Sequence, residues 1–140
     1  MRRLLEFVMT ANAALFFFGA VQHAGIAIGP FHEPSIIPAA IVETLCGSLL
    51  LCGAASIWLR SRIQLRIALA TNLSALSGVL LGIAALAAGA GPRTASNDLY
   101  HRAMLILIGI SLALLVIYRS SFAHKGKTHD SASSFSDSAG

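Results

Sequence analysis

The sequence predicts an all-α membrane protein: a four-helix transmembrane bundle with both termini in the cytoplasm and a disordered C-terminal tail. Of its 140 residues, 56% are hydrophobic and only 11% are charged, whereas soluble domains carry about 25% charged residues. The apolar residues also fall into four long blocks, and about 18 or more apolar residues in a row are typical of a membrane span. We therefore expect one membrane domain over residues 1–119 and a tail over residues 120–140.

The first expected span covers residues 4–28 and follows the basic pair Arg2 and Arg3. The small residues at 11 and 13 resemble a signal-peptide cleavage site, but Glu6 interrupts the apolar stretch before them. The strongest apolar run, residues 15–18, comes after that site. This block is therefore interpreted as a true span.

The second expected span covers residues 36–59. A turn rich in glycine and proline precedes it, and Pro38 suits the first turn of a helix. Trp58 lies at the other end of this span, where an aromatic belt would place it.

The third and fourth spans are expected over residues 65–88 and 98–118. Glycines and a proline within residues 89–92 break the third helix, and Asn97 or Asp98 can cap the fourth. From residue 120 onward the chain is rich in serine and has almost nothing to bury, which predicts a disordered tail.

The formal charge of +4 is explained by membrane orientation. With four spans, eight Lys and Arg residues of the flanks lie on one side and only Arg93 and Arg102 on the other. The crowded side, which is cytoplasmic by the positive-inside rule, carries Arg2, Arg3, Arg60, Arg62, Arg66, Arg119, Lys125 and Lys127. No basic stripe interleaved with aromatic residues is found, so nucleic acid is not an expected partner.

A few polar side chains lie inside the spans. Each costs about 2.5 to 3.5 kcal/mol at the centre of a membrane helix if it is charged, so such residues usually face the bundle interior. The candidates for ligand binding or proton relay are Glu43, His23, His101, Asn72 and Asn12. Glu43 shares its helix face with Ala39, Gly47 and Ala54, which predicts a closely packed neighbouring helix.

Depth along the helices separates these candidates into two groups. Glu43, His23 and His101 are expected in the outer half of the bundle, together with His32, Glu33 and Asp98, and the two asparagines in the inner half. Such a group could hold a metal through His23, Glu43 and His101, position a quinone or relay protons, although no spacing here is a metal motif. Alternatively, Glu43 is protonated or bonded to a neighbouring helix, and the histidines are solvated at the membrane interface.

On the third span, Ser74, Gly78 and Gly82 form a stripe of small residues. Packing within the bundle explains this stripe, and a homo-oligomer seam is the alternative.

The first half of the chain resembles a known family. Arg3 opens the first helix, which contains FFGAVQH at residues 17–23. The second span reads PAAIVETLCGSLLLCG at residues 38–53, with Glu43 followed by a glycine, an aliphatic run and another glycine. This pattern is similar to the DoxX-like group of small four-span bacterial membrane proteins. The resemblance implies a multi-pass protein of the bacterial cytoplasmic (inner) membrane, sometimes a partner of redox enzymes such as thiosulfate:quinone oxidoreductase.

The leading functional hypothesis is a DoxX-like, quinone-facing or accessory subunit of a redox or stress-response system, with Glu43 and His23 lining its interior site. Quinone is then the candidate cofactor, a membrane or soluble oxidoreductase the candidate partner, and the chain is not an enzyme on its own. One alternative is a small proton-coupled transporter or channel-like unit in which Glu43 carries the proton. Another is a structural or assembly factor for a membrane complex.

Overall fold

The computed structural model describes residues 1–28, 34–91 and 94–136, with side chains as far as Ser120. These residues form four helices: α1 (Arg2–His23), α2 (Ile37–Trp58), α3 (Gln64–Ala87) and α4 (Ala95–Ser136). Each of the four is long and apolar enough to cross a membrane. The predicted all-helical architecture, with four helices able to cross a membrane, is confirmed for the described residues.

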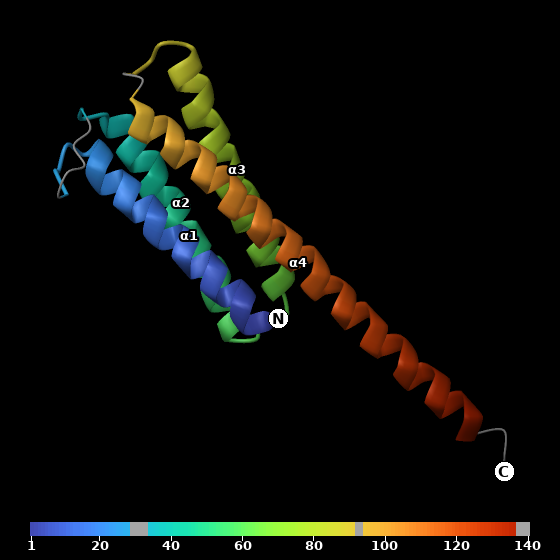
Figure 1. Cartoon of the computed structure of the whole chain (residues 1–140). Coiled ribbons are helices and arrows are strands. Elements are labelled where there is room, and N and C mark those ends of the chain that lie inside the picture. The colour runs from blue at the N-terminus through green and yellow to red at the C-terminus, as the bar shows by residue number, and fades with distance from the viewer. Residues whose placement is uncertain (29–33, 92–93, 137–140) are drawn as a thin grey trace.

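The helices run alternately up and down, each beside its neighbour in sequence (Figure 1). α1 packs against α2 and α4, and α3 packs against the same two helices, so the four close into a ring. The N-terminus therefore lies at the same end of the bundle as the α2–α3 connection and the point where α4 leaves it.

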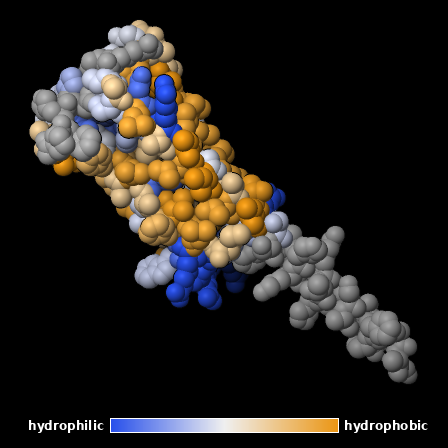
Figure 2. Space-filling view, in the orientation of Figure 1, coloured by the Kyte–Doolittle hydropathy of each residue, from blue (hydrophilic) through white to orange (hydrophobic). Residues whose placement is uncertain are grey.

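The bundle interior is filled by one face of each helix. On α1, Leu5, Met9, Ala13 and Phe16 recur at spacings of three and four residues and are all buried, as the helical repeat requires. They pack against buried residues of the other three helices, namely Cys46, Leu50, Ala54, Ile57, Ala68, Ala75, Val79, Met104, Ile108, Leu115 and Tyr118. The outer faces are also apolar, since many large hydrophobic side chains on them are exposed. Figure 2 shows this hydrophobic surface along the middle of the visible face, with hydrophilic groups at both ends of the bundle.

Three helices end in the same way. After α1, Gly25 adopts a positive φ of 85°; its N–H donates to Gln22 O at 2.9 Å, and the next N–H donates to Val21 O at 3.3 Å. This is a Schellman motif, which stops a helix by satisfying its last carbonyls. Arg60 (φ 53°) and Gly89 (φ 79°) take the same place after α2 and α3. The first helix was expected to run to about residue 28; the motif ends it at His23.

The start of α4 also differs from expectation. Thr94, and neither Asn97 nor Asp98, is the N-cap, because Thr94 Oγ1 accepts a hydrogen bond from the Asn97 N–H at 3.1 Å. The helix therefore begins at Ala95. Asn97 therefore lies within the first turn of α4, and its side chain is buried in the bundle.

The end of α4 lies beyond the expected boundary near Tyr118. The helix continues to Ser136, and the part after Ser120 extends away from the other three helices (Figure 1). The composition predicted no structure here because there is little to bury, but the hydrogen bonds of an α-helix are local and do not depend on a packing partner. The segment takes no part in the bundle.

Candidate functional site

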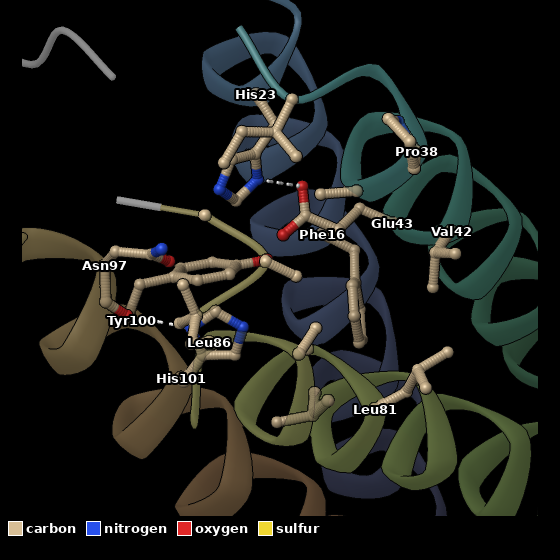
Figure 3. A pocket seen from close by; sticks show the side chains of 18 residues that line it. Phe16, His23, Pro38, Val42, Glu43, Leu81, Leu86, Asn97, Tyr100 and His101 are labelled. Carbon is tan, nitrogen blue, oxygen red and sulfur yellow. Dashed lines mark hydrogen bonds and ion pairs between the residues drawn. The ribbon is translucent and has the colours of Figure 1, made fainter. Parts of the chain in front are cut away.

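A cavity of about 270 Å³ lies at the end of the bundle where α1 ends and α4 begins. All four helices contribute to its wall, which is mostly aliphatic. Five polar side chains interrupt this apolar lining: His23 from α1, Glu43 from α2, and Asn97, Tyr100 and His101 from α4 (Figure 3). A mostly apolar cavity with a few converging polar groups is the usual form of a small-ligand site.

His23 and Glu43 form a buried pair on one side of this cavity. His23 Nδ1 lies 2.8 Å from Glu43 Oε2, and the two residues are 4% and 7% exposed. The chain reversal after α1 positions them: the Ile36 N–H donates to His23 O at 2.7 Å, which fixes the start of α2 beside the end of α1. His23 is thereby placed opposite Glu43, which lies two turns into α2.

Two glycines allow α1, α2 and Tyr100 to approach closely. A Cβ on Gly47 would lie 3.2 Å from Ala13 O of α1, so the neighbour expected beside the Glu43 face is present. A Cβ on Gly19 would overlap the Tyr100 hydroxyl and lie 2.9 Å from Glu43 Oε1. The Tyr100 hydroxyl and the Glu43 carboxylate therefore converge on the space that Gly19 leaves open.

On the other side of the cavity, α4 presents Asn97, Tyr100 and His101 from adjacent turns. His101 Nδ1 lies 2.9 Å from Asn97 O; since a carbonyl oxygen only accepts, this nitrogen carries the proton. Nε2 of the same ring is turned toward Gly82, where a Cβ would lie 2.6 Å away. In a neutral ring this Nε2 is a hydrogen-bond acceptor on the cavity wall.

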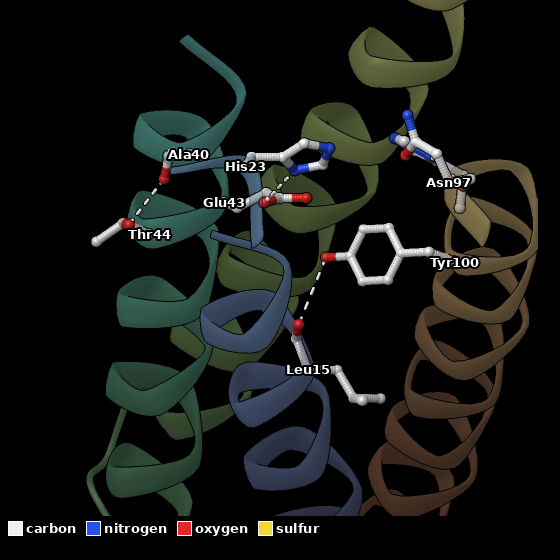
Figure 4. Close-up of polar contacts among 8 residues, drawn as sticks. Leu15, His23, Ala40, Glu43, Thr44, Asn97 and Tyr100 are labelled. Carbon is white, nitrogen blue, oxygen red and sulfur yellow. Dashed lines mark hydrogen bonds and ion pairs between the residues drawn. The ribbon is translucent and has the colours of Figure 1, made fainter. Parts of the chain in front are cut away.

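Tyr100 lies between the two histidines. Its ring makes edge contacts with His101, at a centroid distance of 5.4 Å, and with His23 at 6.5 Å. Its hydroxyl donates to Leu15 O of α1 at 3.5 Å, as Figure 4 shows. The tyrosine thus connects the α4 side of the cavity to the His23–Glu43 pair.

The cavity reaches the outer surface of the bundle between α2 and α3. Two of its lining residues, Pro38 of α2 and Leu81 of α3, are exposed, and Leu81 is exposed over 61% of its surface. Other large apolar side chains on α2 and α3 are exposed as well, among them Ile37, Ile41 and Leu80. We call this exposed apolar surface the apolar belt. An apolar molecule dissolved in the bilayer would therefore meet this opening.

Three of the five predicted site residues meet here. His23, Glu43 and His101 all line the cavity. The alternative in which the histidines are solvated is wrong, because His23 is 4% and His101 8% exposed; the close packing of Tyr100 covers both. Asp98, which was expected to join them, points outward and is exposed. His32 and Glu33 lie outside the described residues.

Asn12 and Asn72 do not line this cavity. Both are fully buried; Asn12 Nδ2 donates to Leu107 O of α4 at 3.3 Å, and Asn72 Nδ2 donates to Ala68 O at 2.8 Å. Both asparagines lie away from the His23–Glu43 cavity, and their predicted place in the inner half of the membrane stays a prediction. The structure does not support a role for them in ligand binding, because their amide groups donate to backbone carbonyls within the bundle.

The described residues include no group of three or more His, Cys, Asp and Glu side chains that could hold a metal ion. His23 and Glu43 are paired, but His101 faces them across the Tyr100 ring. The suggested metal site of His23, Glu43 and His101 is therefore not formed.

Asn97 and Tyr100 belong to the site although neither was predicted as a site residue. They precede His101 by four residues and one, so all three share one side of a helix. The sequence shows this spacing and could have predicted the shared face. The prediction was missed because Asn97 was interpreted as a helix cap.

The two glycines of the small-residue stripe on α3 pack inside the bundle, whereas Ser74 is exposed. A Cβ on Gly78 would contact Cys46 Sγ of α2, and one on Gly82 would contact His101 of α4. These glycines are therefore explained within one copy of the chain. Gly82 in particular makes room for the imidazole at the cavity.

No protein-family model, no curated protein and no solved structure matches this chain.

Proposed function

We propose that this protein binds the ring of a quinone or quinol in the cavity and serves as an accessory subunit of a membrane redox system. The observation that carries the proposal is the pairing of Glu43 and His23 on one wall with His101 on another, around an apolar interior. The volume of about 270 Å³ is near the lower end for ligand sites and suits a small ring. The opening toward the apolar belt suits a hydrocarbon tail.

The polar groups favour the reduced ligand. A quinol has a hydroxyl at each end of its ring, and each hydroxyl needs an acceptor. Glu43 Oε1 and a neutral His101 Nε2 are acceptors on different walls of the cavity. These side chains can accept and return protons, whereas the electrons must pass to or from a redox partner. We propose an accessory subunit because the electron transfer requires this second protein.

The sequence resemblance to DoxX-like proteins supports the same proposal from an independent direction. It adds the bacterial cytoplasmic membrane as location and an oxidoreductase as partner. We also propose that the N-terminus and the C-terminal part of α4 face the cytoplasm. Basic residues favour the cytoplasmic side of a membrane, and this end of the bundle carries Arg2, Arg3, Arg60, Arg62 and Arg66. The cavity would then lie in the half of the membrane facing away from the cytoplasm.

Quinone binding tests this proposal directly. Full-length protein purified in mild detergent would be dialysed against ubiquinol-1 and menadiol under reducing conditions, and bound ligand would be measured by mass spectrometry. Glu43→Gln replaces a charged acceptor with a weaker neutral amide oxygen, and His101→Leu removes an acceptor altogether. Each variant should therefore weaken quinol binding at least tenfold. Ser111→Ala is the matched control, since Ser111 is buried on α4 but lies outside the cavity.

Two results would count against quinone binding. If the wild-type protein retains no quinol, quinol is not its ligand. Variants that bind like wild type but melt at lower temperature would instead make the polar cluster a packing device, as an assembly factor requires.

A second candidate, proton transfer across the bundle, is favoured by a different observation. Asn12 Oδ1, Asn72 Oδ1 and Ser111 Oγ are buried without a hydrogen-bond partner among the described residues. Unpaired polar atoms of this kind are usual contacts of buried water, which could extend a path from Glu43. Proton flux into liposomes loaded with a pH-sensitive dye, lost in Glu43→Gln, would support transport; absence of flux in wild type would exclude it.

A further inference from the structure

A second hollow lies at the opposite end of the bundle, between the start of α3 and the part of α4 before Ser120. Its volume is about 540 Å³, so it is larger than the His23–Glu43 cavity. Three arginines line it: Arg62 before α3, Arg66 in the first turn of α3, and Arg119 on α4. We call this hollow the arginine groove.

The groove combines positive charge with an apolar floor. Leu69 of α3 and Leu115 and Val116 of α4 form its wall below the arginines. Leu69 and Val116 are 38% and 66% exposed, so the floor continues into the outer apolar surface of the bundle. A ligand that fits must therefore be anionic at one end and apolar along the rest of its length.

The charge in the groove is not compensated within the described chain. No ion pair to Arg62, Arg66 or Arg119 is formed by the described residues; the acidic side chain at this end, Glu6, pairs with Arg2 at 3.3 Å. Three like charges around one hollow repel one another, and an anion between them relieves this repulsion.

The start of α3 adds to the positive potential. No side chain caps the N-terminus of this helix, and the helix dipole places partial positive charge there. Gln64, at the first position of α3, also lines the groove, and its Oε1 is buried without a partner. A rotation of the Gln64 side chain toward the groove would bring Oε1 within reach of a ligand hydroxyl, which would supply the donor that it needs.

We propose that the arginine groove is a binding site for one anionic phospholipid, with phosphatidylglycerol as the best chemical match. The phosphate lies among Arg62, Arg66 and Arg119, a glycerol hydroxyl of the headgroup donates to Gln64 Oε1, and an acyl chain follows the floor toward the membrane centre. Arginine suits this role because its guanidinium binds phosphate through two parallel N–H donors. This inference does not depend on the proposed quinone function.

Lipid retention by the full chain tests the proposal. Detergent-purified protein would be titrated with phosphatidylglycerol or phosphatidylcholine of the same chain length and followed by native mass spectrometry. Wild type should bind one phosphatidylglycerol at least tenfold more tightly than phosphatidylcholine. The triple variant Arg62→Gln, Arg66→Gln, Arg119→Gln should lose this preference.

The matched control removes the same number of charges from the same end of the bundle. Arg2, Arg3 and Arg60 do not line the groove, so Arg2→Gln, Arg3→Gln, Arg60→Gln should keep the preference for phosphatidylglycerol. Equal loss in both triple variants would overturn the proposal, because it would show general attraction to a basic surface.

A measurement on wild-type protein covers the case in which the groove variant fails to fold. Phenylglyoxal modifies exposed arginines, and peptide mass spectrometry locates each modified side chain. Phosphatidylglycerol should protect Arg62, Arg66 and Arg119 at least fivefold more than Arg3 and Arg60. Equal protection of all five would overturn the proposal, and so would protection by inorganic phosphate alone, since the latter would indicate an anion site without a lipid.

Discussion

At the scale of single residues, the most informative feature is the contrast between Glu43 and the buried asparagines. Glu43 combines a side-chain partner, His23, with a place on the cavity wall. Asn12 and Asn72 bond only to backbone carbonyls and lie away from it. Similar burial therefore accompanies different roles, and the partner of each side chain distinguishes them.

The His23–Glu43 pair should contribute to stability as a unit. Glu43→Ala leaves a buried imidazole without its partner and should lower the unfolding free energy by about 3 kcal/mol. Glu43→Gln keeps a hydrogen-bonding group and should cost about 1 kcal/mol. The double variant His23→Ala, Glu43→Ala should cost little more than Glu43→Ala alone. Unfolding by titration with sodium dodecyl sulfate measures all three; additive losses would show that the pair is not coupled.

Gly19 should be required for the geometry of the cavity. Gly19→Ala places a methyl group against the Tyr100 hydroxyl and Glu43 Oε1, which should cost about 1 to 3 kcal/mol and weaken quinol binding. Gly109→Ala provides the comparison, because nothing lies within 4 Å of its added Cβ. It should stabilise α4 by up to about 1 kcal/mol through helix propensity. Thermal unfolding in detergent separates the two variants, and similar shifts would contradict the packing shown here.

At the scale of elements, the helix ends determine where side chains arrive. The Schellman motif at Gly25 and the Ile36-to-His23 hydrogen bond place His23 beside Glu43. The Thr94 cap starts α4 early enough for Asn97, Tyr100 and His101 to share the cavity wall. A shift of either boundary by one residue would rotate these side chains by about 100° around their helix.

The end of α2 contains a strained residue. Arg60 occupies the left-handed position of its Schellman motif with a φ of 53°, where a side chain costs about 1 to 2 kcal/mol relative to glycine. Arg60→Gly should therefore raise the unfolding free energy by about 1 kcal/mol. Arg60→Ala removes the same charge without removing the strain, so it should give no such gain. If both variants stabilise the protein equally, charge repulsion and not backbone strain is the cause.

At the scale of the whole molecule, the sequence predicted the spans well because membrane insertion imposes length and hydropathy on each helix separately. It also predicted that Glu43, His23 and His101 share one half of the bundle, since depth follows from position along a helix. It could not predict which groups touch. The contact of Tyr100 with Gly19 and the inward position of Asn97 depend on the rotation of α4 and on its cap, which are properties of the assembled bundle.

The proposed orientation is testable on the whole molecule. In a background with Cys46→Ala and Cys52→Ala, single cysteines at Arg3 and Ser96 would report opposite ends of the bundle, as both residues are exposed. A membrane-impermeant maleimide should label Ser96→Cys in intact spheroplasts and Arg3→Cys only after permeabilisation. The reverse pattern would invert the bundle and place the arginine groove on the outer side.

The last residue of α2, Trp58, is an intrinsic fluorescent probe of depth in the membrane. Trp58 is the single tryptophan of the chain, and it is 70% exposed beside the loop that leads to Arg62. Its emission therefore comes from one known height in the bundle and needs no attached dye. Lipids brominated near the headgroup should quench it more strongly than lipids brominated near the chain end. The ratio would fix the height of the bilayer surface against the bundle, and with it the depth of both hollows.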